Sequence, residues 1–462
     1  MQTHERTPQD IFSQPQHLAV PVFQRRYVWD ADAQWEPLWR DITRIATKHL
    51  EGEAAQHFLG AVVTQTSTAG GMGLIATHEL IDGQQRLTTL QLLINAAAVE
   101  LEGADFDPLA QQLTSLTHNP QAFGTDGHDT LKLQHENDDR AAFVAVMSAE
   151  APIDYSALPK SRLVQAHQYF AEQITEWLGD PVSAERARAL VFTLSRGLQV
   201  VVIALDHHEP AQEIFETLNA RGTPLTAADL IKNYVFQRIV REGGSAKAAF
   251  RDHWQDLERP FWTKEVSIGR YTMERLSLFL NHWLVARTGE EVSTRSTFTR
   301  FKTWFEESGR SMTDVLSSLH RQAAVFEAWV DNSRRSQGDL DPIPLFLYRT
   351  EAADVEAVKP LLLYLFDMDS HLPTPVAAEA LRDIESWVMR RALLRRPASE
   401  YSRVVAGLIN DLRHVPPDNV AVALRASLQR LNRPGTYWPG TLELTKELST
   451  ASVYTQPKAR VR

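Results

Sequence analysis

The sequence of 462 residues contains no cysteine. This absence excludes disulfides, thiolate nucleophiles, cysteine-bound zinc and iron–sulfur clusters. The sequence also lacks any apolar run near the 18 residues of a membrane-spanning helix, because its longest runs, such as 200–205, have the length of a strand. Residues 1–6 show no basic region followed by an apolar one, so no secretory signal is expected. We therefore expect a cytoplasmic protein without a membrane partner.

Lysine is scarce, since 38 of the 48 basic residues are arginine, and the net charge is −10. An acidic protein does not bind polyanions indiscriminately, so a DNA contact would be confined to a local basic patch. Guanidinium groups suit such a patch, because they bind phosphate in a bidentate manner. The most basic helical stretch contains Arg390, Arg391, Arg395, Arg396 and Arg403. A partner-facing or solvated surface is the alternative interpretation of this stretch.

Strand and helix patterns mix in the first half of the chain, and no repeat of fixed period is present. Strands are predicted at 17–23, 58–66, 74–81 and 198–205, and helices at 33–50, 85–101, 161–195, 211–219 and 227–240. Pro21 makes the first strand an edge strand or an extended entry. The polar segment 103–159 is predicted to be an insertion. We assign residues 1–242 to one mixed α/β domain.

From residue 243 onward the strand patterns disappear and helical patterns dominate. Helices are predicted at 272–286, 311–331, 354–366, 376–394 and 402–412. The predicted fold class is therefore α+β, with a mixed N-terminal domain followed by a mostly α-helical domain at 243–462.

The strongest local motif is the run Asp-Gly-Gln-Gln-Arg at 82–86, where a predicted strand ends and a helix begins after Gly83. A helix N-terminus has free N–H groups and a partial positive charge, which suits a phosphate. Arg86 in that first turn favours a bound anion. Asp82 could hold Mg²⁺ or orient water, and Gln84 and Gln85 could position the attacking water. The alternative is a plain strand–turn–helix junction with Asp82 as the N-cap.

The second motif runs from Val20 to Trp29 and pairs two arginines, Arg25 and Arg26, with aromatic residues. Such a surface can stack on bases and bind phosphates. The alternative is an arginine pair at the rim of a core that contains Phe23, Tyr27 and Trp29.

The third motif spans 214–233, and its candidate phosphate ligands are Asn219, Arg221, Lys232 and Asn233. Local structure explains part of the motif, because a helix C-cap near Gly222 and a capping box from Thr226 and Asp229 account for the small residues. The alternative interpretation of the rest is a solvated helix face.

Other motifs give weaker indications. The pair at 207–208 has few metal-ligand neighbours, and the sequence His-Val-Pro-Pro at 414–417 matches a His-x-x-Pro nuclease signature only in spacing. No Walker phosphate loop, dinucleotide fingerprint or serine elbow is present.

Taken together and in this order, the three motifs resemble the GmrSD-type restriction family. The resemblance rests on Phe23-Gln24-Arg25, on Asp82 to Arg86 with the following Leu-Thr-Thr, and on Phe215 to Asn233. The segments 387–391 and 453–462 extend it over essentially the whole chain. The resemblance implies a ParB/sulfiredoxin-like N-terminal core that binds and hydrolyses a nucleoside triphosphate and takes part in defence against foreign DNA.

Site roles follow from this resemblance. Asp82, Gln84, Gln85 and Arg86 would be catalytic, with Asp82 on Mg²⁺. Gly83, Arg25, Arg26 and the third-motif ligands would bind the nucleotide, and Phe23, Gln24 and Tyr27 would sense a DNA modification. Position 23 is Phe where relatives often have Tyr, which removes a hydroxyl.

Relatives usually continue into an HNH-type nuclease domain. This sequence ends at residue 462, and position 414 lies too early for that motif, so we expect the nuclease in a missing segment or a partner chain. An SspE-like sensor of phosphorothioate DNA is favoured over an enzyme that acts on modified cytosines, and a homodimer is compatible with either. The alternatives are a non-catalytic module that binds modified DNA, with the nucleotide as allosteric ligand, and a partner-binding protein built on the helical half.

Overall fold

The computed structural model describes residues 2–66, 75–120, 130–205, 226–268, 271–335, 337–367 and 372–450. The chain forms two compact units, Met1–Pro224 and Leu225–Arg462. The sequence placed this boundary at 242/243, because helix α9 (Ala227–Arg241) was assigned to the first half. In the structure α9 packs against the helices that follow it, α10, α12, α13 and α14, and buries Ile231, Val235 and Phe236 among them.

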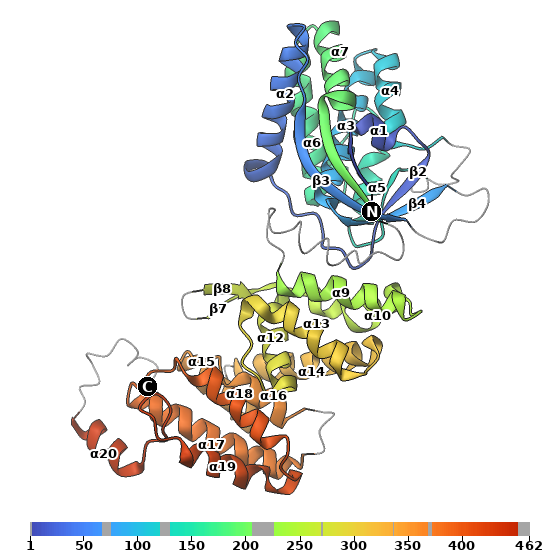
Figure 1. Ribbon diagram of the computed structural model, residues 1–462. Helices are drawn as coiled ribbons and strands as arrows, with labels where there is room; N and C mark the ends of the chain where they lie inside the picture. The colour runs from blue at the N-terminus through green and yellow to red at the C-terminus, as the bar shows by residue number, and fades with distance from the viewer. Residues whose placement is uncertain are drawn as a thin grey trace. The chain divides into compact units, whose positions relative to one another are not determined.

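A six-stranded mixed sheet forms the centre of the first unit (Figure 1). The spatial order of its strands is β1-β6-β3-β4-β2-β5. The strands are β1 (Gln2–Arg6), β2 (Gln16–Val20), β3 (His57–Thr66), β4 (Ala76–Asp82), β5 (Leu133–His135) and β6 (Leu198–Leu205). The pairs β1–β6 and β3–β4 are antiparallel, and the other three pairs are parallel. The predicted α+β class is confirmed by this mixed sheet and by the helical second unit.

Strand β2 lies inside the sheet, between β4 and β5, so its prediction as an edge strand was wrong. The argument from Pro21 failed because β2 ends at Val20. The proline therefore lies beyond the ladder, where its missing N–H costs no hydrogen bond between strands.

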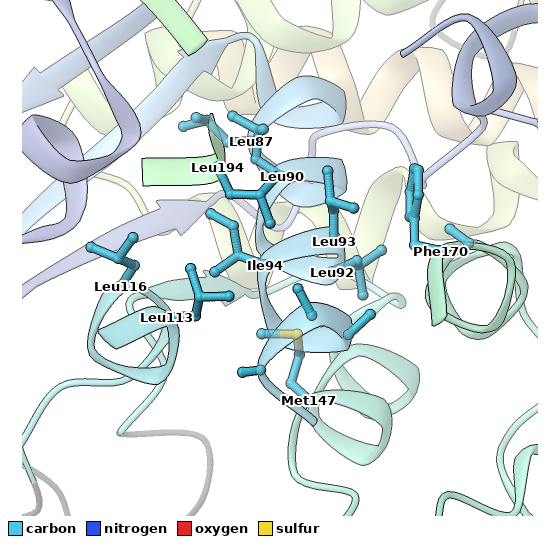
Figure 2. Close-up of a cluster of buried hydrophobic side chains, with 14 of the residues drawn as sticks. Leu87, Leu90, Leu92, Leu93, Ile94, Leu113, Leu116, Met147, Phe170 and Leu194 are labelled. Carbon is cyan, nitrogen blue, oxygen red and sulfur yellow. The ribbon is translucent and has the colours of Figure 1, made fainter. Parts of the chain in front are cut away.

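Helix α3 (Gln84–Gly103) is the core of the first unit, since sixteen of its residues are buried. Figure 2 shows its Leu87, Leu90 and Leu93 among side chains from surrounding elements. The other helices of this unit are α1 (Pro8–Phe12), η1 (Ala31–Trp35), α2 (Glu36–Leu50), α4 (Asp107–Thr117), α5 (Arg140–Met147), η3 (Tyr155–Ala157), α6 (Arg162–Leu178), α7 (Ala184–Phe192) and η4 (Thr193–Gly197). A helix buried on all sides has a fixed position, so its N-terminus is held rigidly.

The segment 103–159 was predicted to be an insertion, but the structure builds it into the core. It contributes α4, α5 and the edge strand β5, and its side chains Leu113, Leu133 and Phe143 are fully buried. Its polar composition misled the prediction, because short elements leave most of their residues at the surface.

Among its described residues, the second unit is helical except for one hairpin, β7 (Glu265–Ile268) and β8 (Tyr271–Glu274). This hairpin was not predicted, and the helix expected from 272 begins at Arg275. The remaining elements are α10 (Ala246–His253), η5 (Gln255–Glu258), α11 (Pro260–Thr263), α12 (Arg275–Thr288), η6 (Thr294–Ser296), α13 (Thr297–Ser308), α14 (Met312–Ser333), α15 (Pro342–Ala352), α16 (Lys359–Leu365), α17 (Thr374–Leu393), α18 (Tyr401–Leu412), η7 (Pro417–Asn419), α19 (Val420–Arg430) and α20 (Thr441–Thr450). Within the described ranges, no helix has both the length and the apolar character needed to cross a membrane.

Within the basic stretch at 390–403, Arg391 has a structural role, whereas Arg395 and Arg403 are exposed. Arg391 is fully buried, and its guanidinium donates to the carbonyl oxygens of Pro397, Gly435 and Tyr437. Arg390 donates a hydrogen bond to Ser386, and Arg396 and Arg403 form ion pairs with Glu443 and Glu400. Arg391 is therefore inaccessible to DNA, and it ties the irregular segment after α19 to helix α17.

We predict that Arg391→Met destabilises the second unit by about 2–4 kcal/mol, because three buried carbonyl groups lose their donor. Urea unfolding followed by tryptophan fluorescence measures this loss. Arg403→Met is the matched control, since its exposed ion pair contributes less than about 1 kcal/mol. Equal unfolding midpoints for the two variants would contradict the structural role of Arg391.

Candidate functional site

Strand β4 ends at Asp82, Gly83 turns the chain, and α3 begins at Gln84. Gly83 has φ of 86°, in the left-handed region that favours glycine. A Cβ atom there would also lie 2.7 Å from Cγ2 of Val62 and 3.2 Å from the carbonyl oxygen of Ala61. Glycine is therefore required at the point where the predicted strand–turn–helix motif turns.

The N-terminus of α3 carries no side-chain cap and no acidic residue in its first turn. Asp82 lies just outside the helix, and its Oδ1 accepts a hydrogen bond of 2.7 Å from the N–H of Gly83. Burial raises the pKa of the Asp82 carboxyl, while that hydrogen bond and the charges of Arg86 and Arg25 oppose the increase. Three charged groups thus lie near one helix N-terminus.

Arg86 is anchored beside β3. Its guanidinium donates to the carbonyl oxygen of Ala61 and lies over Gly60, where a Cβ atom would be 2.8 Å from Nη2. Burial lowers the pKa of Arg86, and the charge of Asp82 counteracts this effect. Since arginine stays protonated even with a lowered pKa, the site keeps a fixed positive charge.

The two glutamines have different roles. Oε1 of Gln85 accepts from the N–H of Val28 at 2.8 Å, and its Nε2 donates to the carbonyl oxygen of Arg26 at 3.1 Å. Nε2 of Gln84 donates to the carbonyl oxygen of Arg25 at 3.0 Å. Oε1 of Gln84 is buried and has no hydrogen-bond partner in the described part of the chain. The structure therefore gives Gln85 a bracing role rather than the predicted role of positioning water, whereas Gln84 keeps an unused acceptor.

These hydrogen bonds bring the first two motifs together. Nε2 of Gln24 also donates to the carbonyl oxygen of Ile81, at 3.3 Å. The side chains of Phe23 and Tyr27 lie in the core, with 6% and 5% exposure, and the Tyr27 hydroxyl is shared between Thr89 and the indole of Trp35. Of the three predicted sensing residues, Gln24 is thus the one that keeps partial exposure, and of the two predicted nucleotide ligands Arg25 is partly exposed and Arg26 is exposed.

Three residues that sequence reasoning missed hold the same loop from its other side. Asp139 accepts the N–H of Tyr27 at 2.6 Å, and Asn137 donates to the carbonyl oxygen of Gln24 at 3.3 Å. Asp138 forms an ion pair with Arg26. The run Glu-Asn-Asp-Asp at 136–139 was the available signal, but it lies in the segment that was interpreted as an insertion.

The third motif lies mostly outside the described residues, including Asn219 and Arg221, as does the pair at 207–208. Lys232 and Asn233 belong to the second unit and are buried. Lys232 forms an ion pair with Glu258 and lies 5.2 Å from the centre of the Phe250 ring, so its charge is neutralised there. The capping box of Thr226 and Asp229 is confirmed. His414 is an exposed residue after α18.

A divalent cation would find one carboxylate, Asp82, directly before α3. No group of three or more His, Asp or Glu side chains is arranged to hold a metal in the ranges that the structure describes. Mg²⁺ is commonly bound by one or two carboxylates together with phosphate oxygens and water. The donor set therefore fits Mg²⁺ only in combination with a phosphate ligand.

Residues 8–236 match the family model of the GmrSD restriction endonuclease, N-terminal domain. The matched region contains the loop at 20–29, the Asp82–Arg86 motif and Asp138. It supports a GmrSD-type restriction family for the chain. A search of curated proteins finds no match.

We predict that Gln85→Met destabilises the first unit by about 1–3 kcal/mol, because the N–H of Val28 and the carbonyl of Arg26 lose their partner. Chemical denaturation of the full chain measures the change. Gln111→Met, at an exposed position of α4, is the control and should leave the unfolding midpoint unchanged. A stable Gln85→Met protein would show that the loop does not depend on this bracing.

Proposed function

We propose that this chain is the nucleoside-triphosphate-hydrolysing sensor part of a restriction system that acts on modified DNA. The family match of residues 8–236 supports the restriction role. The observation that carries the hydrolytic part is the N-terminus of α3, which has no acidic residue in its first turn and has Arg86 beside it.

Phosphate binding is supported by the electrostatics of that helix end. The first-turn N–H groups have no acceptor within the helix, and the partial positive charge of the helix adds to the charges of Arg86 and Arg25. The geometry of Gly83 fixes the direction of these N–H groups, so the site is preorganised. In this proposal Arg86 stabilises the charge that develops on the transferred phosphoryl group.

Asp82 and Gln84 are the candidates for the water and the cation. The unused Oε1 of Gln84 can accept a hydrogen bond from a water molecule. Asp82 would hold Mg²⁺, which supplies charge neutralisation at the phosphates when it is bound. Gln85 is excluded from direct participation, because both ends of its amide are bonded to the backbone.

DNA sensing is assigned to the loop that the glutamines hold. Since Gln84 and Gln85 bond to the backbone of Arg25, Arg26 and Val28, a ligand on this loop would also affect the start of α3. Modified DNA is therefore expected to change the rate of hydrolysis. The phosphorothioate group and the modified cytosine are the two candidate marks, and the nuclease would be supplied by a further domain or a partner chain.

A non-catalytic module that binds modified DNA is the second candidate. It is favoured by the bracing role of Gln85, which leaves fewer groups for catalysis than the sequence indicated. Nucleotide binding without phosphate release, with and without DNA, would support this candidate over the enzyme.

We predict that Arg86→Lys lowers the rate of phosphate release by about 10²–10³-fold, because an ammonium group cannot replace the planar donors of guanidinium. Release is measured across the four nucleoside triphosphates, with unmodified and phosphorothioate DNA in parallel. Circular dichroism and the unfolding midpoint show whether the variant is folded. Arg44→Ala, which removes an exposed ion pair on α2, is the control. Wild-type turnover in a folded Arg86→Lys protein would refute the assignment.

The rate should also fall in acid as Asp82 becomes protonated. Because burial raises the pKa of Asp82, the loss is expected at a higher pH than for an ordinary aspartate. Arg25 lowers this pKa, so Arg25→Gln should move the acid limb of the pH–rate profile to still higher pH. Profiles of kcat/KM for both proteins test the shift, and an unchanged limb would remove Asp82 from the mechanism.

A further inference from the structure

The second unit contains a cavity of about 280 Å³ that the function proposed above does not use. Helix α12 contributes one face to it, with Arg275, Leu278, Phe279 and His282 at positions i, i+3, i+4 and i+7. Phe326 and other side chains of α14 lie opposite, and strand β7 and helix α15 complete the wall.

Arg275 is the unusual residue of this cavity. It is the first residue of α12, and its side chain is almost completely buried, with 6% exposure. Its guanidinium donates to the carbonyl oxygen of Phe261 at 3.0 Å and lies 4.1 Å from the centre of that ring. No carboxylate forms an ion pair with it in the described part of the chain. Arginine has five N–H donors, so most of its donor capacity is unused.

The start of α12 gives a second, independent indication. This helix of 14 residues has no side-chain cap and no acidic residue in its first turn. The residue at its N-cap is Glu274, and the positive end of the helix adds to the charge of Arg275. Glu351, Asp331 and Glu356 act on the charge of Arg275 only from a distance, so an anion in the cavity would supply the ion pair that it lacks among the described residues.

The other charges of the cavity are arranged differently. Arg334 is paired with Glu351 at 2.9 Å, and Lys359 with Glu356 at 2.6 Å. Lys264, Glu265 and Asp354 are exposed. Arg334 and Lys359 therefore have carboxylate partners, whereas Arg275 has no ion pair in the described part of the chain.

The walls supply apolar contacts and a neutral polar group. Leu278, Phe279 and Phe326 line the cavity, and all three are buried. His282 is buried as well, and burial lowers its pKa to about 3, so its ring is neutral at pH 7. The volume equals that of about nine water molecules, close to the lower limit of known ligand pockets.

We propose that this cavity binds a small organic anion, whose carboxylate or phosphate group pairs with Arg275 while its apolar body lies against Leu278, Phe279 and Phe326. The site is separate from the start of α3 and does not depend on nucleotide hydrolysis. Its ligand is a molecule of about ten non-hydrogen atoms. A nucleotide is too large for the volume of this cavity.

Isothermal titration of the full chain with benzoate and phenyl phosphate tests the proposal, with benzamide as the neutral probe of the same shape. We expect millimolar or tighter binding of at least one anion, no binding of benzamide, and a loss of affinity of at least about tenfold in Arg275→Met. Arg310→Met, an exposed change with the same loss of charge, should bind as the wild type does.

A second variant covers the case in which Arg275→Met does not fold. Val266→Trp places a large ring at the wall formed by β7 and leaves Arg275 in place, so it should also abolish binding. Wild-type affinity in either folded variant, equal binding of benzamide, or the absence of binding by both anions at millimolar concentration would overturn the proposal.

Discussion

The first unit depends on the amide hydrogen bonds that two consecutive glutamines make at the start of its most buried helix. Gln84 and Gln85 hold the backbone of Arg25, Arg26 and Val28, a segment some sixty residues away in sequence. Because α3 is packed on all sides, this anchor cannot move without disturbing the core. The loop is consequently tied to the start of the helix by hydrogen bonds. A phosphate ligand at α3 and a ligand on the loop would therefore affect the same hydrogen-bonded part of the first unit.

Close packing around the same helix end limits what this site can contain. Gly83 lies against β3, and Arg86 occupies the space over Gly60, so neither glycine can accept a side chain. The charged groups are few, and burial shifts the pKa values of both Asp82 and Arg86 toward their neutral forms. Each group offsets part of this shift in the other, which makes the pair interdependent. A ligand with negative charge would stabilise the arginine further, and a cation would stabilise the aspartate.

Sequence patterns predicted the structural features that depend on neighbouring residues in the chain. The strand, the glycine turn and the helix start at 82–86 follow from residue types alone, and the strand at 198–205 has the predicted bounds. Long-range partners could not be predicted in this way. Nothing near Gln85 in sequence indicates Val28, and the buried role of Phe143 in α5 was hidden by the polar residues around it. The edge assignment of β2 failed because the strand ends at Val20, before Pro21, and its two neighbours in the sheet are distant in sequence.

The polar residues on which the two proposed sites rest, Gln84 and Arg275, share unused hydrogen-bonding capacity. Arg391 and Arg275 are both buried arginines on helices, yet Arg391 reaches three carbonyl oxygens and a tyrosine hydroxyl, whereas Arg275 reaches one carbonyl. Gln85 and Gln84 differ in the same way, because one amide is bonded at both ends and the other at one end. Burying a polar group without partners is costly, and a ligand that completes its bonds is the explanation proposed at these two sites. Unused hydrogen-bonding capacity is thus the feature that supports both proposed ligand sites, the start of α3 in one unit and the cavity at α12 in the other.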